Sequence, residues 1–178
     1  MKNRNTIFTT ILFALAFLVL SPIAQAINPP PDGGYAGNNT AEGTQALQSL
    51  SGGIDNTALG FQALFHNTAG NNNTAEGFRA LFANTTGSQN TATGAQALFS
   101  NTGNFNTADG FNTLFHNTTG TQNTATGRGA LFNNIAGSFN TADGVNALLN
   151  NTASENTAVG QQALFHNTHR PRQYGHRY

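Results

Sequence analysis

Polar and apolar residues along this chain follow a unit that recurs eight times. The second copy, residues 56–72, begins with Asn-Thr-Ala-Leu-Gly and continues to Ala-Leu-Phe-His-Asn. Successive copies are 16 or 17 residues apart, and their opening residues are Asn39, Asn56, Asn73, Asn90, Asn106, Asn123, Asn140 and Asn156. A fixed period of this length is typical of solenoid proteins, in which each copy forms one coil and stacks on its neighbours.

Each unit predicts two short strands. A Gly and an Asn-Thr pair interrupt every copy, so no helix of ordinary length fits between them. The segments Asn-Thr-Ala-x-Gly and x-Ala-Leu-Phe-x-Asn remain, residues 56–60 and 62–67 of the second copy. Stacked copies would form parallel strands with a rise of about 4.8 Å per coil. The sequence therefore predicts an all-β protein, a parallel β-solenoid (β-roll) of eight 16–17-residue coils.

Two residues of the first strand recur in every copy and predict structural roles. The opening Asn predicts a stacked ladder of side-chain amides at a turn. The Gly four residues later predicts a positive φ or a close approach between coils. We expect these roles for Asn56, Gly60, Asn73, Gly77, Asn90 and Gly94. A sugar-binding array of Asn side chains is the less favoured alternative, because every copy needs the same Asn for folding.

In most copies a Phe follows the repeated Leu, so stacked coils would align these Phe residues in a column. By strand alternation Leu would face one way while Ala and Phe face the other, so a Phe ladder would lie outside if Leu fills the interior. Each exposed ring would forgo about 2 kcal/mol of burial. We therefore expect an intersubunit seam, most simply in a homotrimer; alternatively, a wide coil folds Phe inward. The candidate seam residues are Phe65, Phe82, Phe99, Phe115, Phe132 and Phe165, with Leu149 between the last two.

The first 26 residues predict a signal peptide. Lys2 and Arg4 form a basic start, an apolar run extends from Ile7 to Leu20, and Ala-Gln-Ala ends the segment at Ala26. An uncleaved membrane anchor is the alternative, but the run is short for a span of about 20 apolar residues. We expect cleavage after Ala26 and a secreted or cell-surface protein without a membrane span.

The chain then divides into three further segments. Residues 27–37 predict a Pro/Gly linker, residues 38–168 the β-solenoid repeat domain, and residues 169–178 a basic C-terminal tail. In the first copy, residues 48–53 depart from the Phe-x-Asn-Thr pattern, as expected for a capping coil. Pro171 cannot donate to a strand ladder. The tail is therefore expected to be frayed, or alternatively to form a second cap.

Composition and charge exclude several functions. Only 8% of residues are charged, the formal net charge is zero, and Cys is absent. A neutral chain is poorly suited to nucleic acid, and the lack of Cys excludes disulfides and thiolate metal sites. Carboxylates do not recur beside His or Ser at a fixed spacing, and the periodic glycines belong to turns. We therefore expect no enzymatic activity and no cofactor.

Three histidines occupy the same position of the unit. His66, His116 and His166 are separated by three coils each, about 14 Å, which is too far to share one ion. Other copies carry Ser, Ala or Asn there. We expect solvated side chains rather than a metal site, since only a threefold assembly could bring copies of one His together.

The recurring Asn-Thr-Ala-x-Gly-x-x-Ala-Leu resembles the head repeats of YadA-type trimeric autotransporter adhesins. In that family such repeats form a left-handed parallel β-roll, three chains pack into one head, and the head binds matrix proteins or other surfaces. The unit here is longer than the family's usual coil, and neither a heptad stalk nor a C-terminal anchor follows within the sequence. The resemblance implies a homotrimeric, head-like module that binds an extracellular protein or glycan.

Two other functions fit the same fold, because one scaffold hosts many functions. A structural matrix or surface-layer protein would assemble end to end. An ice-binding solenoid would display a grid of Thr-x-Thr pairs, but the first strand has them only at Thr91/Thr93 and Thr124/Thr126. A non-enzymatic adhesion module is therefore the expected function, followed by the structural protein and then by ice binding.

Overall fold

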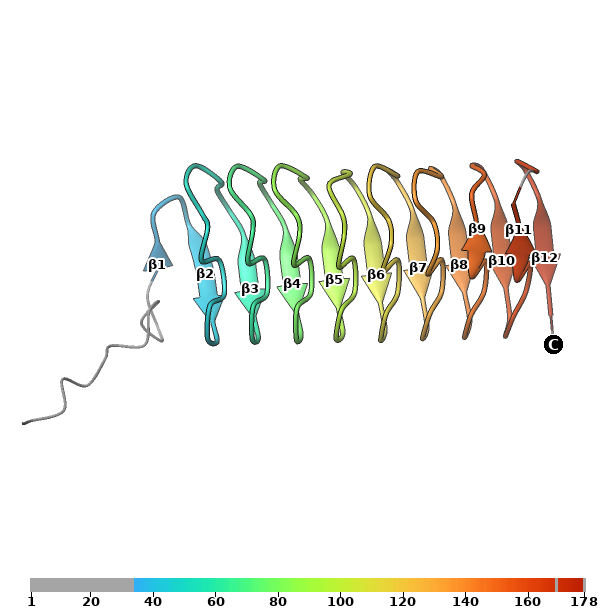
Figure 1. The fold of residues 1–178 in the computed structure, drawn as a ribbon, viewed down its shortest axis with the longest axis horizontal. Helices are drawn as coiled ribbons and strands as arrows, with labels where there is room; N and C mark the ends of the chain where they lie inside the picture. The colour runs from blue at the N-terminus through green and yellow to red at the C-terminus, as the bar shows by residue number, and fades with distance from the viewer. Residues whose placement is uncertain (1–33, 169, 178) are drawn as a thin grey trace, which may run out of the picture.

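The computed structural model describes residues 34–168 and 170–177 as a rod of stacked coils (Figure 1). The predicted signal peptide and most of the predicted linker lie outside these residues. A ten-stranded sheet runs along the rod, and the described residues form no helix. The predicted all-β class and parallel β-solenoid are confirmed.

One short strand per coil builds this sheet. Neighbouring strands pair in parallel with equivalent residues opposite each other, as in Ala92 with Ala108. Within each strand the central Ala is buried and the flanking side chains are less so, which is the alternation expected of a strand. The strands are β2 (Asn39–Glu42), β3 (Thr57–Leu59), β4 (Thr74–Glu76), β5 (Thr91–Thr93), β6 (Thr107–Asp109), β7 (Thr124–Thr126), β8 (Thr141–Asp143) and β10 (Thr157–Val159).

Two further strands extend the sheet at its ends. β1 (Gly34–Tyr35) pairs antiparallel with β2, and β12 (Tyr174–His176) pairs in parallel with β10. These strands come from the predicted linker and the predicted tail. In the first coil Leu50 is half-buried and packs against the core. The sheet is thus extended at both ends by chain that departs from the repeat.

The prediction of a second strand in each unit is wrong for most coils. Gln62 and Leu64 have φ of 56° and 50°, and equivalent residues in other coils adopt the same left-handed conformation. Such residues turn the chain instead of extending it. Only β9 (Asn150–Asn151) and β11 (His166–Asn167) form a short parallel pair in this part of the coil.

This turn changes which side chains face inward. Ala63 and Leu64 are adjacent, yet both are fully buried, while Phe65 is half-buried on the outside. The expectation that Ala and Phe share one face is therefore wrong, because it assumed regular strand alternation. Of the two alternatives for the interior, the structure has Leu inside. Ala and Leu side chains form one continuous core along the rod.

Two ladders of buried Asn side chains flank this core. The backbone N–H and the Nδ2 of Asn56 each donate to Oδ1 of Asn39 at 2.9 Å, and Nδ2 also donates to the carbonyl of Gly70 at 2.8 Å. The backbone N–H of the opening Asn in each later coil likewise donates to Oδ1 of the preceding opening Asn. The second ladder consists of Asn67, Asn84, Asn101, Asn117, Asn134, Asn151 and Asn167.

The repeated Gly lies where successive coils approach most closely. Gly60, Gly77 and Gly94 have φ of 127°, 139° and 119°, a region that residues with a Cβ rarely adopt. A Cβ on Gly94 would lie 2.8 Å from the carbonyl carbon and oxygen of Gly110 in the next coil. Both the conformation and the contact therefore require Gly.

We expect Gly94→Ala to lower the free energy of unfolding by about 3 kcal/mol, from backbone strain and the clash with Gly110. Urea unfolding monitored by circular dichroism measures the change. Gly52→Ala is the matched control, because a Cβ there would meet no atom within 4 Å. Equal stabilities of the two variants would contradict the assigned role of Gly94.

Candidate functional site

A stack of aromatic rings runs along one outer face of the rod. Centroids of successive rings are 5.3, 5.0, 4.9 and 5.3 Å apart, and their planes differ by 11° or less. We call these five residues the aromatic ladder: Phe65, Phe82, Phe99, Phe115 and Phe132. All five are half-buried. Because each ring covers the face of the next, the ladder presents ring edges outward.

The ladder ends at Phe132. The next coil carries Leu149 at this position, and Phe165 lies one coil further on, stacked on no other Phe. The structure therefore brings together five of the six candidate seam residues and separates the sixth. A ring stack that stops leaves the last ring without an aromatic neighbour on one side.

A second aromatic row lies beside the ladder. The rings of Phe61 and Phe78 stack with centroids 5.5 Å apart. The guanidinium carbon of Arg79 is 5.1 Å from the centroid of Phe78 and 5.4 Å from that of Phe82. Arg79 thus bridges the second row and the ladder through cation–π contacts. Phe111 belongs to the second row and is 50% exposed.

A row of polar side chains accompanies the two aromatic rows. Nε2 of Gln62 donates to Oε1 of Gln45, and Nε of Arg79 donates to Oε1 of Gln62, both at 2.7 Å. We call this position of the coil the amide row. Its members are Gln45, Gln62, Arg79, Gln96, Asn112, Gly129, Asn146 and Gln162. Gly129 is the one member without a side chain.

A hollow of about 340 Å³ opens where Gly129 interrupts the amide row. We call it the Gly129 notch. Three departures from the repeat coincide there: Arg128 instead of a mostly apolar residue, Gly129 instead of an amide or Arg, and Leu149 instead of Phe. The lining residues are Phe111, Asn112, Arg128, Gly129, Phe132, Asn133, Asn146 and Leu149.

The polar groups of the notch are incompletely paired. Oδ1 of Asn112 is screened from solvent and has no hydrogen-bond partner among the described residues. Oδ1 of Asn146 lies only 2.5 Å from the point where a Cβ of residue 129 would stand. On the ladder side, Nδ2 of Asn133 donates to Oδ1 of Asn150 at 2.6 Å. The missing side chain at residue 129 thus leaves the amide oxygen of Asn112 unpaired, and the Asn146 amide leans into the place that a Cβ would take.

The three histidines lie along the border of the ladder. The His66 ring meets Phe65 and Phe82 edge-on, with centroids 4.6 and 4.9 Å apart, and His116 makes equivalent contacts. His166 Nδ1 is 3.0 Å from Nδ2 of Asn150. All three side chains are exposed. Within residues 34–168 and 170–177, no group of three His, Cys, Asp or Glu side chains could hold a metal ion.

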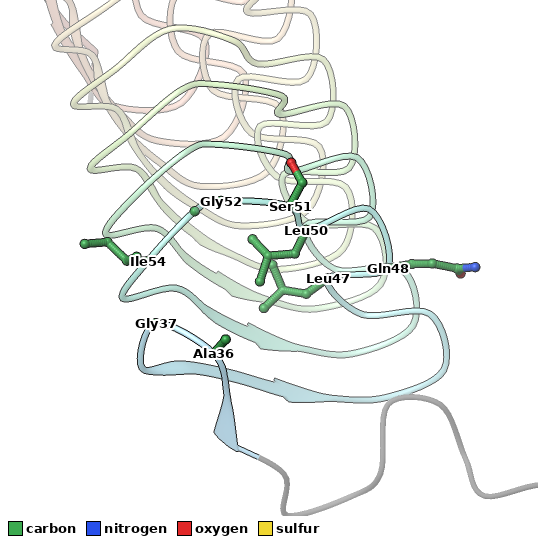
Figure 2. A pocket seen from close by; sticks show the side chains of 9 residues that line it. Ala36, Gly37, Leu47, Gln48, Leu50, Ser51, Gly52 and Ile54 are labelled. Atoms are coloured by element: carbon green, nitrogen blue, oxygen red, sulfur yellow. The ribbon is translucent and has the colours of Figure 1, made fainter.

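A second hollow, of about 350 Å³, lies at the N-terminal end of the solenoid. Figure 2 shows the side chains of Leu47 and Leu50 close together over the coil interior, while Gln48 points away from it. Ala36 and Ile54 line the opposite side, and no titratable side chain contributes to the lining. This hollow is the open end of the apolar core, so it suits an end cap better than a ligand.

The outer face of the sheet carries Thr and a variable residue from each strand. The Thr-x-Thr pairs of β5 and β7 are exposed. They are not adjacent, because β6 lies between them and presents Asp109. The face therefore lacks a continuous Thr grid of the kind that ice binding would use.

No protein-family model, curated protein or solved structure matches this chain. In the part of the chain that the structure describes, no helix is long and apolar enough to cross a bilayer. The function of the chain is therefore inferred from the aromatic ladder and the Gly129 notch. The sequence indicated the ladder by its period; the notch is found only by comparing each coil with the others.

Proposed function

We propose that the chain is an exported, non-enzymatic adhesion module that binds a host or environmental surface through the faces of its solenoid. The aromatic ladder is the observation that carries this proposal. Five half-buried rings form a continuous apolar strip over five coils. Contiguous apolar patches on soluble proteins commonly mark interaction sites. The resemblance of the repeat to YadA-type heads and the predicted signal peptide agree with this function.

The same strip supports self-association. Ring edges along a rigid rod suit close packing against apolar side chains of another chain, and a parallel homotrimer would align equivalent coils. In such a trimer the ladder from Phe65 to Phe115 would form the seam. The end of the ladder at Phe132, the second aromatic row and the sheet face would stay available for ligands. End-to-end structural assembly is the second candidate, favoured by the positions of β1 and β12 at the two ends of the described sheet.

We expect the mature chain, residues 27–178, to show saturable binding to at least one immobilised matrix protein or glycan. Surface plasmon resonance against a panel of both classes measures it. Negative-stain images and thermal hysteresis of the same sample test the two alternatives. Filaments without saturable binding would favour the structural protein, and thermal hysteresis without binding would favour ice recognition.

A further inference from the structure

We propose that the Gly129 notch binds an acidic pyranose, a six-membered sugar ring that carries a carboxylate. This inference rests on the proposed adhesion function and names the class of glycan that one site would recognise. It follows from four properties of the notch: its aromatic wall, its unpaired amides, its arginine and its size.

The aromatic wall comes from the end of the ladder. Phe99 and Phe115 have a ring on each side, whereas Phe132 has a ring on one side and Leu149 on the other. Phe111, which also lines the notch, stacks on no other Phe and is half exposed. Unstacked ring faces carry partial negative charge, and the C–H groups of a pyranose pack well against such faces. Within the ladder, neighbouring rings cover these faces.

The amides supply hydrogen bonds for hydroxyl groups. At the start of the amide row a side chain from the next coil pairs with the amide oxygen: Gln62 donates to Gln45, and Arg79 donates to Gln62. For Asn112 the next member is Gly129, so its Oδ1 stays unpaired. An unpaired amide oxygen gains a full hydrogen bond when a donor reaches it. Rotation of the Asn112 and Asn146 side chains would present both donors and acceptors to a sugar ring beside Gly129.

The charge of the notch selects an acidic ligand. Arg128 is exposed and forms no ion pair with any described carboxylate. No Asp or Glu lines the notch. Guanidinium groups bind carboxylates through two parallel hydrogen bonds. The equivalent residues of the other coils carry no charge: Thr44, Phe61, Phe78, Ala95, Phe111, Val145 and Gln161.

The size of the notch matches one ring. Its volume of about 340 Å³ is near the lower end of the range for small-molecule sites, about 300–1,000 Å³. The ladder closes one side and the amide row of the neighbouring coils closes another. A longer glycan would therefore place one acidic residue in the notch and extend over the outer surface.

The test titrates the mature chain with methyl glucuronide, and with methyl glucoside as the matched neutral sugar. Saturation-transfer NMR detects contact and isothermal calorimetry gives the affinity. We expect binding of the glucuronide, and an affinity about tenfold or more lower in Gly129→Gln because the new side chain fills the notch. Arg128→Gln should remove the preference for the acidic sugar, whereas Arg79→Gln, a control on the same face, should leave affinity unchanged.

Folding of the key variant can be checked independently. Gly129 has φ of 67°, close to the 56° and 54° of Gln62 and Arg79 at equivalent positions. A Cβ at residue 129 needs only the Asn146 amide to move. The new amide can also pair with Asn112, so Gly129→Gln should melt no lower than the wild type. A loss of sugar binding with an unchanged melting temperature would therefore reflect the notch itself.

Three outcomes would overturn the inference. The first is no glucuronide binding by the folded wild type, and the second is equal affinity in wild type and Gly129→Gln. The third is a change of oligomeric state in Gly129→Gln, which would mean that a second copy fills the notch. Adhesion to immobilised surfaces by a chain that fails the sugar test would leave the proposed function standing. Sugar binding without adhesion to any surface would contradict the proposed function but support the sugar site at the notch.

Discussion

Replacing Phe82, Phe99 and Phe115 together by Ser is expected to dissociate the mature chain into folded monomers. Their rings are half covered by their neighbours in the monomer, so an intersubunit seam would gain about 1 kcal/mol per ring. Three rings then contribute about 3 kcal/mol per protomer, which changes an association constant by roughly a hundredfold. Size-exclusion chromatography with light scattering measures the effect at micromolar concentration.

The control for this experiment uses two residues on the outer face of the sheet. Glu76 and Asp109 are exposed at the ends of β4 and β6, so changing them to Ser should leave the mass unchanged. Far-ultraviolet circular dichroism must show that the triple variant keeps its β content. A wild type that is monomeric at micromolar concentration, or a triple variant that stays assembled, would exclude the ladder as the seam.

Asn123→Asp is expected to lower the free energy of unfolding at pH 7 by about 3–5 kcal/mol, the cost of an uncompensated buried charge. Nδ2 of Asn123 donates to Oδ1 of Asn106 at 3.1 Å and to the carbonyl of Gly137 at 2.9 Å. A carboxylate would turn both donor contacts into contacts between acceptors. The hydrogen bond that Oδ1 of residue 123 accepts from the N–H of Asn140 would remain, because a carboxylate oxygen also accepts.

The stability deficit of Asn123→Asp should depend on pH in one direction. Burial raises the pKa of the introduced carboxyl above its unfolded value of about 3.9. The loss of stability is then full above the raised pKa and disappears as the pH falls towards the unfolded value, where the protonated carboxyl donates again. Asn71→Asp is the control, since Oδ1 of Asn71 accepts from the N–H of Ile54 at 2.9 Å and its Nδ2 donates to none of the described residues. A stability deficit of Asn123→Asp that does not depend on pH would contradict the ladder as its cause.

The period of the sequence was sufficient to predict the architecture. An Asn and a Gly that recur in every copy indicate positions where each coil meets the next, and these are where the structure has Asn56 and Gly60. The second Asn ladder was missed, although Asn67 and its equivalents recur in seven of the eight copies. Constancy between copies was the available signal, and it was applied only to the first strand.

Backbone conformation limited the rest of the prediction. Nothing in the letters Gln-Ala-Leu-Phe indicates that Leu64 adopts a φ of 50°, which is uncommon for a branched apolar residue. Regular alternation therefore placed Ala63 on the wrong face. The notch was not predicted for a different reason. The repeat pattern indicates residues that recur, whereas the notch depends on Gly129, which departs from the repeat.

The stacking of each coil on its immediate neighbours also determines how the rod can fold and fail. Parallel strand pairs join residues 16 or 17 positions apart, as Thr107 does with Thr91 and with Thr124. Loops of this length close at small entropic cost, so one formed pair of coils can act as a template for the next. Folding would then proceed outward coil by coil, without the pairings between distant residues that slow the folding of most β proteins. Unfolding would then begin at the two ends, and a lesion in a central coil would divide the rod into two shorter, separately cooperative halves.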